Sequence, residues 1–312
     1  MKKITIVGAG RVGESTAQIL AKEELCRELV LLDIQEGVPQ GMALDIQESA
    51  SLLRFDTKVS GHSNPAAMAD SELVIVTAGF PRKPGMSRSD VLDANLKIID
   101  SVVDNIVRYA PESMVMMVTN PVDVLTWYVW SKTGWERRRV FGQSGALDTA
   151  RMASFIAMET GYSIKDISPL VLGGHGDAMV PLVRFSDIAG IPLEHFLDPQ
   201  AIARIVQRTR QGGGEILSLK QHSSAYDSPA AAIAAMVDAI SHHRNRILPC
   251  VSILDGEYGQ HDIAMGIPAV LNENGLVKII ELDLNDKERR EFEASADMVR
   301  ADIERLPHRE TA

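Results

Sequence analysis

A single histidine flanked by glycines is the residue of this chain whose setting best suits proton transfer. His175 lies in the sequence Gly173-Gly174-His175-Gly176, directly after the short apolar run 170–172. Glycines permit a tight turn and the close approach of a ligand, and an imidazole exchanges its proton near neutral pH. A histidine in a glycine-rich turn is by itself more often structural, so its interpretation depends on the other motifs of the chain.

An aspartate and an arginine share one face of a predicted helix over residues 143–160. Asp148 and Arg151 are three positions apart, and residues at that spacing are neighbours on a helix. An ion pair on an exposed helix surface is the ordinary interpretation. The apolar residues Leu147 and Phe155 close by favour a partly buried pair instead.

The amino-terminal segment predicts an anion-binding turn between a strand and a helix. Residues 3–7 are apolar and rich in β-formers, and Gly8, Gly10 and Gly13 follow before a helical segment. In this G-x-G-x-x-G pattern the first glycine makes the turn, the second lets a pyrophosphate approach the backbone, and the third lets the helix pack on the strand. The amino end of the helix then stabilises the anion.

An acid at the end of the second predicted strand indicates which dinucleotide binds. Asp33 follows the apolar residues 29–32 and lies 20 positions after Gly13. A carboxylate there accepts hydrogen bonds from ribose hydroxyls and repels a 2′-phosphate, which favours NAD over NADP. A glycine turn with an unrelated surface acid is the alternative.

Two arginines lie in a segment that predicts an irregular loop. Residues 81–88 contain two prolines and a glycine, residues that interrupt regular structure. Arg82 and Arg88 are six residues apart and can reach one small anion if the loop folds over it. A solvated basic loop is the alternative.

Two asparagines are further candidates for ligand binding. Asn120 follows the predicted strand 113–118, and open α/β sheets bind ligands at the carboxyl ends of their strands. Its amide both donates and accepts hydrogen bonds, although an ordinary Asn-Pro turn explains the position as well. Asn95 lies within a predicted helix over residues 89–109 and is a candidate to face the cofactor.

Composition narrows the class of protein. The formal net charge is −10 with 45% hydrophobic residues, and an acidic chain is a poor partner for nucleic acid. No apolar run approaches the ~20 residues of a membrane span, and the first residues do not resemble a secretory signal. Cys26 and Cys250 give neither a disulfide framework nor a zinc pattern. These features predict a cytoplasmic protein with no metal, membrane or nucleic-acid partner.

The order of the predicted elements indicates an α/β fold in two domains. Strands and helices alternate up to about residue 144, which predicts a Rossmann domain with a doubly wound parallel sheet over residues 1–144. Residues 145–312 predict an α+β substrate domain containing an antiparallel meander of the segments 248–254, 263–271 and 275–280. A helix over residues 199–219 is expected to bend at its three consecutive glycines.

Together these motifs resemble the lactate/malate dehydrogenase superfamily, and within it the lactate-dehydrogenase-like malate dehydrogenases of bacteria. The resemblance covers nearly the whole chain. It rests on ordered motifs at compatible spacing, namely Gly8-Ala9-Gly10-Arg11-Val12-Gly13, Asp33, Pro81-Arg82-Lys83-Pro84-Gly85-Met86-Ser87-Arg88, Val118-Thr119-Asn120-Pro121, Leu147-Asp148-Thr149-Ala150-Arg151 and Gly173-Gly174-His175-Gly176-Asp177.

The resemblance implies a reversible, NAD-dependent oxidation of (S)-malate to oxaloacetate, a reaction of the tricarboxylic acid cycle. His175 would accept the proton of the 2-hydroxyl, and Asp148 would orient the imidazole and stabilise its protonated form. Arg151 would bind the C1 carboxylate through two parallel hydrogen bonds.

Three further residues would complete the substrate site under the same resemblance. Arg88 would polarise the C2 carbonyl oxygen, and Asn120 would donate a hydrogen bond to it. Arg82 would meet the second carboxylate of the substrate. Because lactate-specific relatives carry a neutral residue at that position, Arg82 is the main reason to expect malate. The cofactor-binding residues implied are Gly8, Ala9, Gly10, Arg11, Val12, Gly13, Asp33, Asn95, Val118, Thr119 and Asn120.

Two alternatives remain at the level of sequence. One is a dehydrogenase for lactate or another 2-hydroxy acid. The other is a non-catalytic NAD-binding protein on the same fold, since fold does not fix function, although the complete set of Asp148, Arg151 and His175 disfavours it. The resemblance further implies a homodimer or homotetramer.

Overall fold

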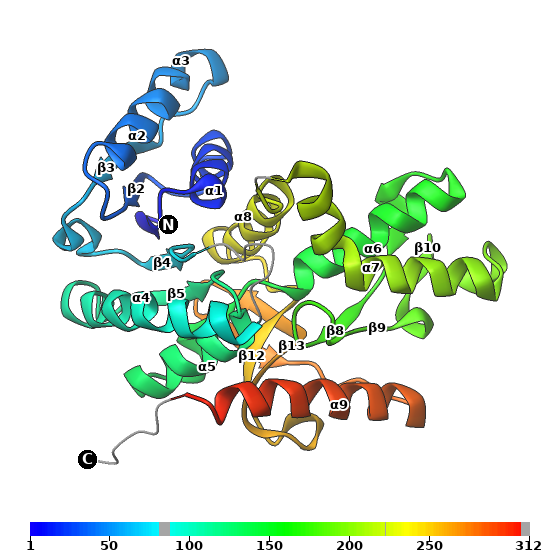
Figure 1. Cartoon of the computed structure of the whole chain (residues 1–312). Helices are drawn as coiled ribbons and strands as arrows, with labels where there is room; N and C mark the ends of the chain where they lie inside the picture. Colours follow the sequence, from blue (N-terminus) through cyan, green and yellow to red (C-terminus); the bar gives the residue numbers. More distant parts are fainter. Residues whose placement is uncertain (81–87, 222, 307–312) are drawn as a thin grey trace.

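The computed structural model describes residues 1–80, 88–221 and 223–306, with the side chains of residues 88 and 89 also left undescribed. Every structural statement below concerns this part of the chain. Figure 1 shows the parallel strands of the first half and the strands of the second half meeting near the centre of the molecule, with α9 along one side.

The first half is a doubly wound parallel sheet, as the alternating strands and helices predict. Its strands follow the order β3-β2-β1-β4-β5-β6, so the winding reverses between β1 and β4, where such sheets bind ligands. The strands are β1 Lys3–Val7, β2 Glu28–Leu32, β3 Lys58–His62, β4 Leu73–Val76, β5 Met114–Met117 and β6 Val140–Gly142. The helices are α1 Arg11–Lys22, α2 Val38–Glu48, α3 Ala50–Leu53, α4 Arg88–Tyr109 and α5 Val122–Thr133.

The second half continues the same sheet with antiparallel strands. From β6 the sheet passes to β12, β13, β8 and β9, while β14 pairs with β13 in the predicted meander. The strands are β8 Val171–Gly173, β9 Met179–Pro181, β12 Arg246–Asp255, β13 His261–Asn272 and β14 Gly275–Ile279, with a small separate sheet of β7 Ile167–Ser168, β10 Asp187–Ile188 and β11 Ile191–Pro192. The helices are α6 Gly145–Thr160, α7 Pro199–Lys220, α8 Asp227–Ser241 and α9 Asp286–Ile303.

One apolar core is shared between the two halves. Helix α8 buries Ile233 and Val237 in the same cluster as Ile4, Leu20 and Leu29 of the parallel half. Burying such side chains stabilises the fold by about 1.5–3 kcal/mol each. The helix therefore completes a face of the Rossmann sheet that residues 1–144 cannot cover by themselves.

The helix predicted over residues 199–219 is α7, and Figure 1 shows that its axis changes direction along its length, as its three consecutive glycines predict. Helix α7 runs unbroken from Pro199 to Lys220 through Gly212, Gly213 and Gly214. A Cβ on Gly212 would lie 3.3 Å from the Cδ of Arg151 on α6. The close approach of α6 and α7 is a further reason for a glycine at that position.

None of the helices in the described ranges combines the length and the apolar character that a membrane span requires.

Candidate active site

The three glycines of the amino-terminal turn have different structural causes. Gly8 has φ +107°, and a Cβ there would lie 2.5 Å from the backbone nitrogen of Ala78. A Cβ on Gly13 would lie 2.0 Å from the carbonyl oxygen of Gly8, so this position closes helix against strand. A Cβ on Gly10 would meet no protein atom within 4 Å. Since the protein itself does not exclude a side chain at Gly10, the open space there fits the pyrophosphate of a dinucleotide.

The amino end of α1 is available to an anion. The helix begins at Arg11, and its cap residue Gly10 provides no side-chain hydrogen bond to the first turn. Free amide groups and the helix dipole favour negative charge at such an end. The guanidinium of Arg11 lies 5.7 Å from the ring centroid of Tyr226, which connects this turn to the segment that precedes α8.

Asp33 is fixed beside the glycine turn. Its Oδ2 accepts a hydrogen bond from the amide of Ala9 at 2.8 Å, and its Oδ1 accepts one from the amide of Gln35 at 3.0 Å. The carboxylate therefore stands at the carboxyl end of β2, next to the turn, where a ribose would lie in a dinucleotide site.

Asn95 braces the ends of two strands. Its side chain is 1% exposed, its Oδ1 accepts from the amide of Phe80 at 2.7 Å, and its Nδ2 donates to the carbonyl oxygen of Asn120 at 2.7 Å. These bonds hold together the segments that follow β4 and β5. The side chain of Asn95 is thus engaged by the backbone, while Asn120 itself is exposed and precedes Pro121 through a cis peptide bond.

Val118 and Thr119 extend the same arrangement. The amide of Val118 donates to the carbonyl oxygen of Val76 at 3.0 Å. The hydroxyl of Thr119 donates to the carbonyl oxygen of Ala78 at 2.7 Å. These predicted cofactor residues lie where β4 and β5 end, at the same edge of the sheet as the glycine turn.

The structure brings together three of the predicted catalytic and substrate residues. Nδ1 of His175 lies 2.8 Å from Oδ2 of Asp148, and Nη1 of Arg151 donates to Oδ1 of the same carboxylate at 2.9 Å. The aspartate side chain is 3% exposed, so the interpretation of Asp148 and Arg151 as a surface ion pair is wrong. Because a carboxylate only accepts, Nδ1 carries a proton, which leaves Nε2 of His175 as the proton acceptor.

The environment of His175 favours the protonated ring. Burial lowers the pKa of His175, but the nearby carboxylates of Asp148 and Asp123 and the hydrogen bond to Asp148 outweigh burial and the Arg151 cation, so the pKa is raised above its ordinary value. A raised pKa suits a group that holds a proton during turnover near neutral pH.

Arg151 keeps one edge of its guanidinium for a ligand. Nη1 is occupied by Asp148, whereas Nε is buried and has no hydrogen-bond partner in the described part of the chain. A buried donor without a partner costs about 1–3 kcal/mol.

Sequence reasoning missed two residues that hold the histidine turn. The amide of His175 donates to Oδ2 of Asp123 at 2.9 Å, and the amide of Gly174 donates to Oγ of Ser295 at 2.8 Å. Asp123 is a charged residue inside the apolar sequence 122–125, which is a signal of a special environment. Ser295 comes from α9 and has no comparable signal in the sequence.

The two arginines predicted to lie over the substrate are not placed. Arg82 lies outside the described residues. Arg88 is the first residue of α4, and its side chain is not described.

Two family models account for almost the entire chain. Residues 2–142 match the lactate/malate dehydrogenase NAD binding domain, and residues 145–310 match the lactate/malate dehydrogenase alpha/beta C-terminal domain. The chain belongs to the lactate/malate dehydrogenase family. It accordingly has the α/β architecture with a Rossmann-like parallel sheet that the sequence predicts, and NAD is the cofactor of the matched amino-terminal domain.

Individual members of the family are similar over their full lengths. The malate dehydrogenase of Nitrosococcus oceani is 64% identical over 306 residues, which cover 98% of each chain. The solved malate dehydrogenase of Salinibacter ruber has a TM-score of 0.92 at 40% identity, covering 97% of this chain and 96% of that one. A lactate dehydrogenase of Cryptosporidium parvum, solved with lactic acid and nicotinamide adenine dinucleotide, has a TM-score of 0.94 at 34% identity, covering 98% and 99%.

The family fold alone therefore does not separate the two substrates, because members with either name superpose equally well. Within the described ranges no group of three or more His, Cys, Asp or Glu side chains is arranged to hold a metal ion.

Proposed function

We propose that this chain is an NAD-dependent malate dehydrogenase that interconverts (S)-malate and oxaloacetate. The observation that carries the proposal is the buried trio in which Asp148 hydrogen-bonds both His175 and Arg151. One carboxylate thereby fixes a proton acceptor and a carboxylate-binding cation in a single arrangement.

The residues around the glycine turn fit NAD. The space at Gly10 and the uncapped amino end of α1 would take the pyrophosphate, and Asp33 would accept hydrogen bonds from the adenosine ribose. Bound there, NAD supplies the acceptor for the hydride that leaves C2 of malate.

His175 moves the proton of the reaction. During oxidation Nε2 accepts the proton of the 2-hydroxyl as the C2–H bond breaks and the carbonyl forms. The positive charge on the ring is then stabilised by Asp148 through Nδ1–H, at 2.8 Å. In the reverse direction Nε2 returns the proton to the carbonyl oxygen.

Arg151 orients the substrate by its C1 carboxylate. The Nε and Nη2 groups form the edge of the guanidinium that Asp148 leaves free, and two parallel hydrogen bonds fit a carboxylate there. Holding the substrate in this way places its C2 hydroxyl toward His175, and such orientation accounts for a large part of enzymatic rate enhancement.

Arg82 selects a dicarboxylate. A guanidinium over the far end of the substrate pairs with the second carboxylate of oxaloacetate, whereas pyruvate offers only a methyl group. An unpaired charge in a water-poor site typically costs several kcal/mol, which corresponds to discrimination of roughly 10² or more. The name carried by the 64% identical relative supports the same substrate.

The test is the kcat/KM for oxaloacetate and for pyruvate in the parent and in two single variants. Arg82→Gln should lower the value for oxaloacetate by roughly 10² and raise it for pyruvate. Arg88→Gln, the matched control, should impair both substrates alike because both present the same C2 carbonyl. Equal losses on both substrates in Arg82→Gln would reject malate specificity through this residue.

The same proposal places the protein in the cytoplasm as a homodimer or homotetramer. Large apolar side chains exposed on single elements, among them Leu52 on α3 and Leu219 on α7, are consistent with burial against another copy. Light scattering of the purified protein tests the oligomeric state.

A further inference from the structure

The turn that carries His175 is held by three helices at once. Ser295 of α9 accepts from the amide of Gly174, Asp123 of α5 accepts from the amide of His175, and Asp148 of α6 bonds the imidazole. The three acceptors are 2%, 0% and 2% exposed. The backbone of the turn is therefore fixed separately from the ring.

Two of these acceptors hold the backbone of the turn in the same way, but one is a neutral hydroxyl and the other is a carboxylate. Ser295 and Asp123 each accept one backbone amide hydrogen, from neighbouring residues of the turn. A neutral hydroxyl suffices at Gly174, so a tether alone does not require a carboxylate at the next residue. Burying a carboxylate costs several kcal/mol unless charges and dipoles compensate it.

The position of Asp123 supplies part of that compensation. It is the second residue of α5, where the helix dipole favours negative charge. The partner that changes its charge during the proposed reaction is His175, whose backbone Asp123 contacts directly. A negative charge at this place therefore acts on the imidazole as well as on the turn.

The charged groups around His175 come from few elements. Helix α6 presents Asp148 and Arg151, helix α5 presents Asp123, and helix α9 presents the neutral Ser295 beneath the turn. Asp177 on the turn itself is exposed. Within the described residues the imidazole thus faces two buried carboxylates and one cation, and the second carboxylate offsets the charge of Arg151.

We propose that Asp123 is a positioning residue of the reaction, which fixes the backbone of His175 and whose negative charge sustains the protonated imidazole. This proposal rests on the proposed role of His175 as the proton carrier. It concerns a residue that acts on the reaction through the histidine.

The test compares Asp123→Asn with Ser295→Ala. The asparagine keeps an oxygen that accepts the His175 amide and removes the charge, whereas the alanine removes a neutral tether of the same turn. The measurement is the pH dependence of kcat/KM for malate oxidation, which needs the neutral imidazole, and for oxaloacetate reduction, which needs the protonated one.

Asp123→Asn should lower the pKa of His175, because a stabilising anion is lost. Malate oxidation should then rise with pH at a lower pH, and oxaloacetate reduction should fall at a lower pH, both by the same displacement. Reduction above the transition should be slower by the factor that this displacement implies. Ser295→Ala should lower kcat and leave both transitions in place.

The proposal is overturned if Asp123→Asn has the transitions of the parent, or if Ser295→Ala moves them as far. NADH binding and thermal unfolding establish that each variant is folded, and Asp123→Ser, which retains a hydroxyl acceptor, serves the same comparison if the asparagine variant does not fold. If His175→Ala retains parental turnover, the proposed function fails; if only the Asp123 variants match the parent, the inference alone fails.

Discussion

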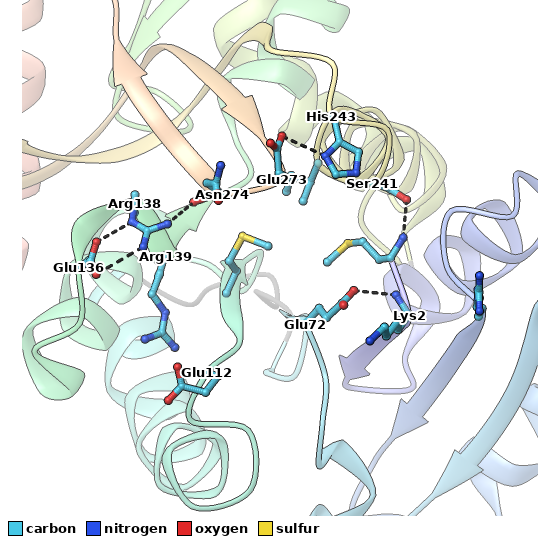
Figure 2. A pocket seen from close by; sticks show the side chains of 14 residues that line it. Lys2, Glu72, Glu112, Glu136, Arg138, Arg139, Ser241, His243, Glu273 and Asn274 are labelled. Atoms are coloured by element: carbon cyan, nitrogen blue, oxygen red, sulfur yellow. Dashed lines mark hydrogen bonds and ion pairs between the residues drawn. The ribbon is translucent and has the colours of Figure 1, made fainter.

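The two edges of the parallel sheet differ in how their polar side chains are paired. At the amino ends of the strands a cavity of about 610 Å³ is lined by Lys2, Glu72, Arg138 and other charged residues. Figure 2 shows these side chains directed at one another, with Arg138 bonded to Glu136 and His243 to Glu273. These two pairs satisfy each other's charges within the protein.

At the carboxyl ends of the strands, several buried polar atoms have no partner among the residues that the structure describes. There the buried Nε of Arg151, the Nε2 of Gln143 and the hydroxyl of Ser144 have no hydrogen-bond partner in the described residues, and Gly10 faces open space. Each buried polar atom left without a partner costs about 1–3 kcal/mol, a cost that a bound ligand can remove. The comparison indicates that buried polar atoms without hydrogen-bond partners locate the candidate site better than the volume of a cavity does.

The largest effect should follow from removing the proton carrier at the carboxyl edge. His175→Ala should reduce kcat by about 10²–10⁴ and leave NADH binding nearly unchanged, because the cofactor is held by other residues. His195→Ala, at an exposed histidine, is the matched control and should turn over like the parent. Steady-state rates and fluorescence titration with NADH measure both, and a variant at position 175 with normal turnover would contradict the assignment.

A smaller effect, on the choice between NADH and NADPH, is expected from replacing Asp33 at the carboxyl end of β2. Asp33→Ser should shift the ratio of kcat/KM for NADH and NADPH by roughly 10–100-fold toward NADPH, as expected for losing hydrogen bonds to a charged group and a repulsive charge. Glu36→Gln, which neutralises an exposed acid three residues further along, should leave the ratio unchanged. Equal use of the two cofactors by the parent would refute the role of Asp33.

Substitutions at two glycines of α7 test whether the position of Arg151 affects substrate binding. Gly212→Ala places a methyl group 3.3 Å from Cδ of Arg151, whereas Gly214→Ala meets nothing within 4 Å. Both substitutions favour the helix by about 1 kcal/mol. The KM for oxaloacetate should rise several-fold, about 3–10-fold, in Gly212→Ala because a displaced guanidinium binds the carboxylate less well. The KM should stay at the parental value in Gly214→Ala. If the two variants have the same KM, the position of Arg151 does not depend on the missing side chain at Gly212.

The smallest effect is expected at the amino edge. Glu136→Gln breaks the ion pair with Arg138 at an exposed position, where such pairs contribute little. Both KM values and kcat should match the parent, and thermal unfolding should be nearly unchanged. A change in KM for either ligand would mean that the amino edge of the sheet affects ligand binding at the carboxyl edge.

Local motifs of the sequence predicted most of the elements, because each is encoded within a few residues. They also named Asp148, Arg151 and His175, which the structure brings together. The run before Gly8 forms β1 over Lys3–Val7, and the meander and the parallel order follow as expected. The edge strand β3 was missed because Lys58–His62 is only partly buried and contains Gly61, so it lacks both an apolar run and a clear alternation.

What the sequence did not reveal depends on distant partners. Asp123 and Ser295 contact the histidine turn across 52 and 121 residues, and no local pattern encodes such a separation. The contact between Gly212 and Arg151 was not predicted, because Arg151 lies on another helix.

The shared core beneath α8 has a consequence for the chain as a folding unit. The ammonium of Met1 donates to Ser241 at the end of α8, whose hydroxyl donates in turn to the carbonyl oxygen of Leu25. With Ile233 and Val237 buried in the same cluster as side chains of α1, which α8 contacts, the beginning of the chain acquires its full packing only after residue 241 has been synthesised. A fragment ending at residue 144 would expose that apolar face and associate with itself or with other proteins, so the two sequence-defined halves are parts of one cooperative structure.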